Sequence, residues 1–155
     1  MVGTGDNEAQ RAPISDHQRV LVQASFAQVL PIADTAARLF YERLFVLDPS
    51  VRPLFRGDLE VQGRALMGMI RVAVNGLDRL EEIVGAVEDL GRRHATYGVQ
   101  PAHYAVVGQP LLDTLKVGLG AAATDEVLAA WTAVYGVLAS VMQRAAAEVR
   151  SHGHP

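Results

Sequence analysis

Apolar residues recur at helical spacing along most of this chain, and this periodicity restricts its fold more than any other feature. Residues three and four positions apart share one face of a helix, and one such stripe runs through Leu80, Ile83, Val84, Val87 and Leu90. A second stripe consists of Val127, Trp131, Val134, Tyr135, Leu138, Val141 and Met142. No segment shows the two-residue alternation of a half-buried strand. The sequence therefore predicts an all-α protein of about seven or eight helices.

Capping residues, prolines and glycines divide this pattern into separate helices. Ser15 and Gln18 have the spacing of a capping box, and Pro31 interrupts the first helical run before residues 32–45 resume it. A corner with two prolines follows at 48–53. We expect the later helices to begin at caps or prolines and to end at glycines, with starts at Asp58, Asp78, Pro101 and Thr124 and stops at Gly76, Gly98, Gly118 and Gly120.

Composition excludes several classes of protein. The 155 residues suit one domain, which we expect over 14–149 between flexible tails at 1–13 and 150–155. Cysteine is absent, so disulfides, thiolate zinc sites and iron–sulfur clusters are excluded. The net charge is −3 without a basic block, which argues against a nucleic-acid partner. The longest charge-free stretch, 127–143, is too short for a membrane span, and the first residues do not have the pattern of a signal peptide. We therefore expect a cytoplasmic protein with no membrane partner.

Three polar residues fall where the helical period predicts burial. His94 continues the stripe of Val87 and Leu90, and it is either a core histidine bonded to backbone or a ligand for a metal or cofactor. Gln62 is in line with Leu66, although glutamine at the edge of a stripe is usually exposed. Tyr41 has the setting of a packed core tyrosine. Taken together, these residues suggest a pocket formed by several helices.

Familiar catalytic motifs are missing from the sequence. It contains no Glu-x-x-His pair of a di-iron bundle, no His-Glu-x-x-His motif, no glycine-rich phosphate loop and no nucleophile elbow. The polar pocket is therefore better explained by a bound cofactor than by a catalytic set of side chains.

Several short stretches resemble the globin family, in particular bacterial single-domain globins and the globin domain of flavohaemoglobins. These stretches are 39–45, 51–55, 62–67, 90–94, 103–108 and 130–136, in the order and spacing of the family, and the resemblance covers roughly 14–144. The resemblance implies a globin fold, which is a 3-over-3 helical sandwich around haem, with haem b as the cofactor.

The resemblance also implies roles for individual residues. His94 matches the iron ligand, and Tyr41, Gln62 and Leu66 match the distal residues beside a bound gas. Tyr104 matches the tyrosine behind the histidine. The remaining haem contacts implied are Phe40, Phe55, Leu90, Val99, Val107 and Trp131, together with Leu66 and Tyr104.

One position departs from the family pattern. Flavohaemoglobins pair the proximal tyrosine with a glutamate in the last helix, whereas this chain has Ala146 there and a glutamate two positions later, at Glu148. A proximal carboxylate strengthens imidazole donation to a metal. Its loss argues against strong redox activation of a bound ligand.

The resemblance therefore implies a haem protein that reversibly binds O₂, CO and NO at a five-coordinate iron. Hydrogen bonds from Tyr41 and Gln62 to a partly anionic O₂ predict high O₂ affinity and slow release, which suit storage or sensing better than oxygen transport. The alternative is a nitric oxide dioxygenase, which would need a separate reductase. A third interpretation is a haemless globin-like interaction or sensor module. The sequence is compatible with a monomer or a homodimer.

Overall fold

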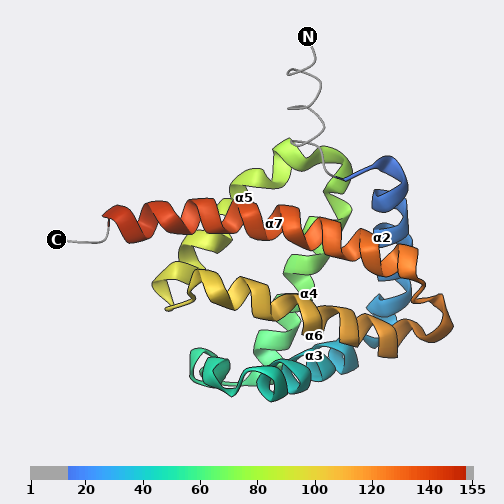
Figure 1. The fold of residues 1–155 in the computed structure, drawn as a ribbon, viewed down its shortest axis with the longest axis horizontal. Coiled ribbons are helices and arrows are strands. Elements are labelled where there is room, and N and C mark those ends of the chain that lie inside the picture. Colours follow the sequence, from blue (N-terminus) through green and yellow to red (C-terminus); the bar gives the residue numbers. More distant parts are fainter. Residues whose placement is uncertain (1–13, 153–155) are drawn as a thin grey trace, which may run out of the picture.

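The computed structural model describes residues 14–152, and the chain over this range is a set of helices joined by short turns (Figure 1). The six α-helices in the described part are α2 (Asp16–Val29), α3 (Ala33–Leu47), α4 (Leu59–Asn75), α5 (Leu80–Thr96), α6 (Pro101–Leu119) and α7 (Asp125–His152). The 3-10 turns are η1 (Leu30–Ile32), η2 (Pro49–Leu54), η3 (Leu77–Arg79) and η4 (Gly120–Ala122). The all-α prediction is confirmed. The number of α-helices is smaller than predicted because the corners form 3-10 turns.

The predicted tails fall mostly outside the described residues. Residues 1–13 and 153–155 are not described, while α7 continues to His152 and so enters the segment 150–155 that was expected to be a tail.

Local capping signals explain where most of the helices begin. The Ser15 hydroxyl accepts a hydrogen bond from the Gln18 N–H at 3.1 Å, and the Gln18 side chain accepts one from the Ser15 N–H at 3.0 Å, so the predicted capping box is present. Asp58 accepts from the Glu60 N–H at 2.8 Å. Thr124 caps α7 by accepting from the Val127 N–H at 3.2 Å.

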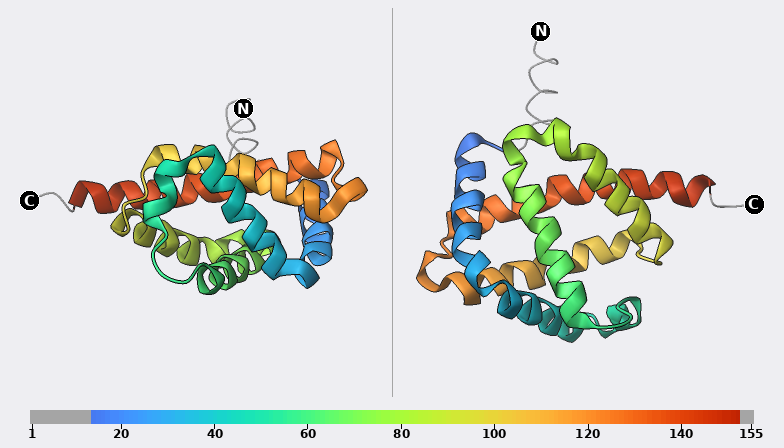
Figure 2. Two further views of the ribbon diagram at one scale, coloured as in Figure 1. Left: turned by 90° about the horizontal axis from the view of Figure 1, so that it is seen from below. Right: turned by 180° about the vertical axis from the view of Figure 1, so that it is seen from behind.

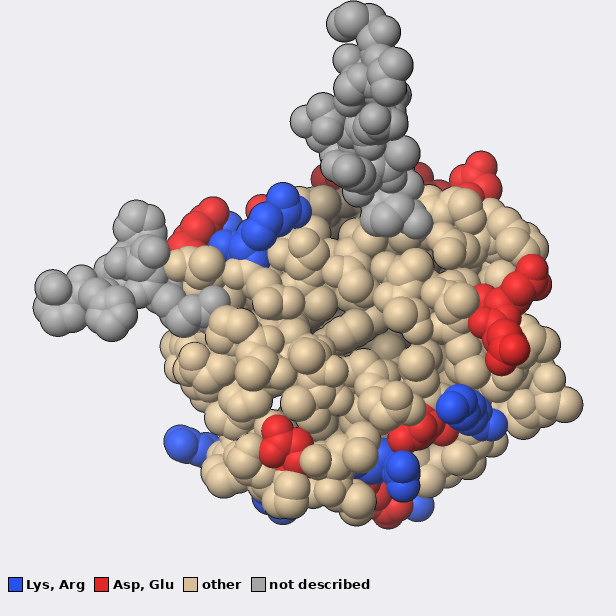
Figure 3. Space-filling model, in the orientation of Figure 1, with Lys and Arg blue, Asp and Glu red and all other residues tan. Residues whose placement is uncertain are grey.

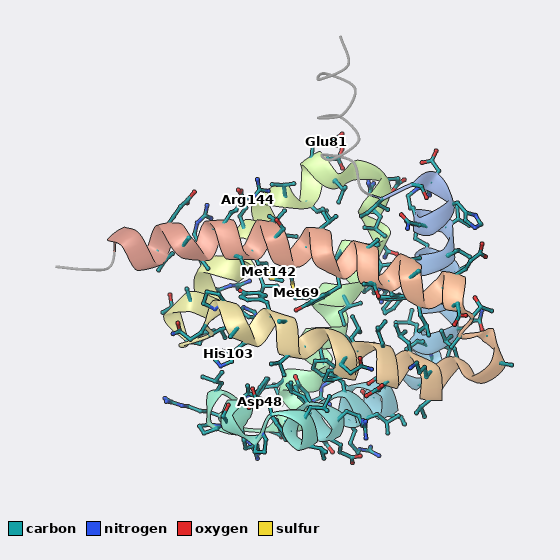
Figure 4. The ribbon with its side chains drawn as sticks, in the orientation of Figure 1. Asp48, Met69, Glu81, His103, Met142 and Arg144 are labelled. Atoms are coloured by element: carbon teal, nitrogen blue, oxygen red, sulfur yellow. The ribbon has the colours of Figure 1, made fainter. Side chains whose placement is uncertain are left out.

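Two further starts combine capping with proline. The side chain of Asp48 accepts from the Ser50 N–H at 3.1 Å and begins η2, which contains Pro49. Pro101 opens α6, where the Gln100 N–H donates to His103 Nδ1 at 2.8 Å. Figure 4 labels both Asp48 and His103.

The prediction that Asp78 begins a helix is wrong. Asp78 lies inside η3, and α5 begins at Leu80 with Arg79 at the N-cap position and no side-chain cap. A tight 3-10 turn directly after Gly76 takes up the residues that were expected to cap the helix. The predicted stop at Gly98 fits the structure, because α5 ends at Thr96 and Gly98 has a φ of 97°.

Two crossing layers of helices enclose the core. Helices α4 and α5 lie on one side of α6 and α7, as the views from behind and below show (Figure 2). Helix α5 packs mainly on α7, α3 packs on α4 and α6, and α2 packs on α7. The larger core cluster includes Phe26 and Trp131. The smaller one surrounds Tyr41 and separates α3, η2, α4 and α6.

Two segments, Asp16–Leu47 and Asp125–Val149, are long and apolar enough to cross a membrane by length and composition alone. The first is not a single rod, because Pro31 and η1 divide it into α2 and α3. Both segments contribute buried residues to the core, as core helices of similar composition commonly do. On the face seen in Figure 3, acidic and basic side chains are scattered around the rim and form no patch of one sign.

Candidate functional site

His94 lies in the last turn of α5, and its ring is held by the helix backbone. Nδ1 lies 2.8 Å from the carbonyl oxygen of Leu90, four residues earlier. Because a carbonyl only accepts hydrogen bonds, Nδ1 must carry the proton and Nε2 must keep a free lone pair. Burial lowers the pKa of His94 below 6.5, outweighing the bond to Leu90, which raises it, while the nearby Arg93 charge lowers it further. The imidazole is therefore neutral near pH 7, which is the form that can bind a metal.

Residues from α6 support this ring. The ring centroids of His94 and Tyr104 are 6.4 Å apart, with an angle of 28° between the planes. The Tyr104 side chain is buried. Its backbone carbonyl accepts a 2.6 Å hydrogen bond from the hydroxyl of Tyr135 on α7. Val99 lies beside the site, because its N–H donates to the His94 carbonyl at 2.9 Å. The structure thus brings together His94, Leu90, Val99 and Tyr104, all of which were predicted site residues.

The helix face where the related proteins have a glutamate is apolar here. Ala146 is completely buried. Glu148 points outward with 64% of its side chain exposed, and it lies 3.8 Å from Arg92. The sequence comparison of these two positions therefore agrees with their placement, and Glu148 is directed to the surface.

Tyr41 lies in a cluster of aromatic rings on the other side of the fold. We call Phe40, Tyr41, Phe45 and Phe55 the aromatic cluster. The Tyr41 ring centroid lies 5.5 Å from that of Phe40, 6.0 Å from that of Phe45 and 5.2 Å from that of Phe55. Leu66 and Val107 pack against the same cluster. The structure therefore groups the predicted distal residues Tyr41 and Leu66 with the predicted haem contacts Phe40, Phe55 and Val107.

The hydroxyl of Tyr41 is available as a hydrogen-bond donor. Only 6% of the residue is exposed, and the structure records no hydrogen bond from its hydroxyl to any residue in 14–152. Burial raises the pKa of Tyr41 to about 12, so the phenol keeps its proton at any pH near neutrality.

Gln62 has a different partner from the one expected. It lies in the first turn of α4, and its side-chain amide donates to the Arg56 carbonyl in the loop before this helix. The predicted hydrogen bond between Gln62 and Tyr41 is therefore absent from the arrangement of these residues. The next residue, Gly63, lets α3 approach closely, because a Cβ at this position would lie 3.0 Å from the Cβ of Ala37 and 3.7 Å from the Tyr41 ring.

Trp131 belongs mainly to the other core cluster. Its indole N–H donates to the Ser25 hydroxyl at 2.8 Å, and its ring is 6.2 Å from that of Phe26. It also lines a small apolar cavity of about 30 Å³ together with Phe40 and Leu66. This cavity joins the two core clusters, so Trp131 lies next to predicted site residues, and its contact with haem stays a prediction.

Phe45 and Arg52 are part of the site region but were not predicted. Phe45 packs between Tyr41 and Phe55, with its centroid 5.4 Å from that of Phe55. The Arg52 guanidinium lies 5.0 Å from the centroid of Phe45 and donates to the Phe55 carbonyl at 3.0 Å. The spacing of Phe45, four residues after Tyr41, is the sequence signal that could have identified it.

These residues suit iron held in a porphyrin. Among the described residues, no group of three or more His, Asp or Glu side chains could hold a bare metal ion. A metal bound by His94 would therefore take its other ligands from a cofactor. A neutral imidazole, a protonated phenol and apolar aromatic walls are the groups that a haem pocket requires.

Comparison with known proteins places the chain in a family. The globin family model matches residues 38–142. The chain belongs to the globin family. The fold agrees, because a globin from Campylobacter jejuni superposes with a TM-score of 0.78 over 88% of this chain and 99% of that one, at 24% identity. The predicted globin fold and family resemblance are confirmed.

The relatives of this globin include larger proteins. The flavohemoprotein of Bordetella pertussis is 33% identical over 132 residues, which cover 83% of this chain and 33% of that protein. The flavohemoprotein of Bacillus subtilis is 34% identical over 109 residues, covering 68% and 27%. The chain thus spans about a third or less of the curated relatives it matches. An engineered carbene transferase from Rhodothermus marinus, a candidate nitric oxide dioxygenase, has a TM-score of 0.82 at 29% identity, covering 90% of this chain and 97% of that one.

Proposed function

We propose that this globin binds haem b through Nε2 of His94 and reversibly binds O₂, with CO and NO as further ligands. The observation that carries the proposal is the fixed tautomer of His94, whose Nδ1–H donates to the Leu90 carbonyl and leaves Nε2 free. When bound, haem would supply the iron that accepts the gas. The chain has no cysteine for a thioether link, which supports non-covalent haem b.

The proximal residues would hold the imidazole in one orientation. The Leu90 carbonyl prevents the His94 ring from turning about its own bond, and the Tyr104 ring lies beside it. A backbone carbonyl polarises an imidazole less than a carboxylate does, and Glu148 is directed to solvent. This proximal arrangement supports reversible binding over redox activation of the ligand.

Tyr41 would supply the distal hydrogen bond. Its hydroxyl has no partner among residues 14–152, its proton is retained near neutral pH, and the aromatic cluster fixes its ring. A phenol O–H stabilises a partly negative O₂ much more than the less polar CO. Gln62 could join only after its amide leaves the Arg56 carbonyl, so we assign the main distal role to Tyr41.

The test is haem binding by the full chain and its His94→Ala variant. The wild-type protein should show a Soret band, and the band should shift when CO is added to the reduced protein. The His94→Ala variant should lose haem readily, and free imidazole should restore binding. His17→Ala is the control, because the His17 side chain is 67% exposed and lies 3.6 Å from Glu126. A His94→Ala protein with unchanged pigment and gas uptake would refute the proposal.

A second candidate function is nitric oxide dioxygenase activity supported by a separate reductase. Similarity at 29% identity to a candidate nitric oxide dioxygenase, and the relation to flavohemoproteins, favour it. Mixing the O₂-loaded protein with NO and measuring nitrate tests the single turnover. Sustained NADH-dependent nitrate formation with an added flavin reductase would establish the enzyme, whereas a single turnover alone would leave reversible gas binding as the function.

A further inference from the structure

The backbones of α5 and α7 touch at Gly91, one turn before His94. Gly91 is buried, and its surroundings leave no space for a side chain. A Cβ at this position would lie 2.6 Å from the Cα of Met142 and 2.8 Å from its carbonyl carbon, with the carbonyl oxygen closer still. Real Cβ atoms essentially never come within 3.0 Å of such neighbours. Because the obstacle is helix backbone, it cannot rotate out of the way.

The crossing lies where α5 passes behind α7 in Figure 1 and in front of it in the view from behind (Figure 2). Figure 4 labels Met142 on α7. The residues one turn further along α7 are small and buried, with Ala145 at 3% and Ala146 at 0% exposed. In an α-helix the Met142 carbonyl bonds to the Ala146 N–H, so the surface that meets Gly91 is built from backbone and methyl groups.

We infer that Gly91 is a positioning residue, and that the α7 backbone at Met142 acts as a fixed stop that sets how far His94 extends from α5 toward a bound cofactor. This inference rests on the proposed function. Gly91 and His94 share a single turn of α5, and the Leu90 carbonyl in the same turn holds the His94 ring. A turn of helix moves as a unit because its hydrogen bonds link each residue to the one four positions on. Any displacement at Gly91 is therefore passed to the imidazole.

The Gly91→Ala substitution converts this geometry into a measurable shift. Ordinary contact begins at 3.4 Å, so separating a Cβ from the Met142 Cα at 2.6 Å requires α5 to move by about 0.8 Å or more. Misplacement of a functional group by about 1 Å can cost a factor of about 10². We expect haem to leave the Gly91→Ala protein about tenfold to a hundredfold faster than the wild-type protein.

Gly85→Ala is the matched control. Gly85 lies on the same helix, is exposed, and has nothing within 4 Å of an added Cβ. Both substitutions make the same change in helix propensity, so a difference between them reports the contact with α7.

The experiment measures three quantities on the wild-type, Gly91→Ala and Gly85→Ala proteins. They are the rate of haem transfer to an excess of apomyoglobin, the iron–histidine vibration of the reduced protein by resonance Raman spectroscopy, and the urea unfolding of the apo-protein. The inference expects faster haem loss and a shifted vibration for Gly91→Ala only. A Gly91→Ala protein with a lower unfolding free energy but a wild-type vibration and haem-loss rate would reduce Gly91 to a packing role and overturn the inference.

A histidine-free background tests whether the effect passes through His94. In His94→Gly supplied with free imidazole, the ligand is not attached to α5, so adding Gly91→Ala should leave the vibration unchanged. A shift that persists in this background would overturn the inference.

Ala146→Gly covers the case in which Gly91→Ala does not fold. It loosens α7 at the Met142 carbonyl without adding an atom, and it should also speed haem loss relative to Gly85→Ala. Unchanged haem loss would overturn the inference. A wild-type protein that takes up no haem would refute the proposed function as well, whereas normal haem binding through His94 with no effect of Gly91→Ala or Ala146→Gly would refute only the positioning role.

Discussion

Replacing Tyr41 by phenylalanine removes one hydroxyl and leaves the ring that the aromatic cluster holds. The ring packs against Phe40, Phe45 and Phe55 at centroid distances of 5.2–6.0 Å, and these contacts do not involve the oxygen. Because the hydroxyl has no hydrogen-bond partner among residues 14–152, the substitution breaks no internal bond. Its effect should therefore fall on the gas ligand.

The expected magnitude follows from the kind of hydrogen bond lost. A hydrogen bond to a charged partner is worth about 1.5–3 kcal/mol, which corresponds to an O₂ dissociation rate faster by about one to two powers of ten. The CO dissociation rate should change much less, since bound CO is less polar. A buried hydroxyl without a partner is costly, so the unfolding free energy of the apo-protein should stay the same or rise by about 1 kcal/mol.

Stopped-flow replacement of O₂ by CO measures the dissociation rate directly. Tyr97→Phe is the control, since it removes the same hydroxyl from a residue that is 69% exposed. If the Tyr41→Phe and Tyr97→Phe proteins release O₂ at the wild-type rate, Tyr41 does not stabilise the ligand and the distal assignment is wrong.

Three further predictions concern stability. The pKa of His94 is lower in the folded protein than its ordinary 6.5, so the unfolded chain binds this proton first as the pH falls; the unfolding free energy of the apo-protein should decrease below about pH 6.5, and urea titrations should show a shallower pH dependence for His94→Leu. Trp131→Phe and Ser25→Ala should each cost about 1 kcal/mol or more by removing the same 2.8 Å hydrogen bond, and a double-mutant cycle should give a clearly less than additive loss. Gly98→Ala should cost about 1–2 kcal/mol because φ is 97° at this position, and thermal unfolding that matches the wild-type curve would contradict that strain.

Helix boundaries with a local cause could be predicted from the sequence. Ser15, Asp58 and Thr124 cap helices through side chains that lie within three residues of their partners, so the sequence contains the whole signal. Asp78 offered the same signal and failed, because the 3-10 turn after Gly76 competes for the same residues. The choice between the two depends on how α4 and α5 pack, which a local pattern does not encode.

The candidate site was predicted where burial and helical period agree. His94 and Tyr41 interrupt apolar stripes, and both are found inside the fold. Gln62 was predicted to lie in the site, but its amide bonds to the Arg56 carbonyl, a partner that depends on the path of the loop before α4. Gly91 gives no signal of its own, since a glycine within a helix pattern reads only as a weak point. Its importance appears once α7, distant in sequence, is placed against it.

The chain contains a single tryptophan, and Trp131 is 3% exposed with its indole N–H bonded to Ser25. All indole fluorescence of the protein therefore comes from one dry, rigid position beside the small cavity. Its emission should lie at short wavelength in the native apo-protein and move to longer wavelength when water reaches the ring. An absorbing pigment nearby should quench it by energy transfer, so one unlabelled fluorophore can report both unfolding and cofactor uptake in the same cuvette.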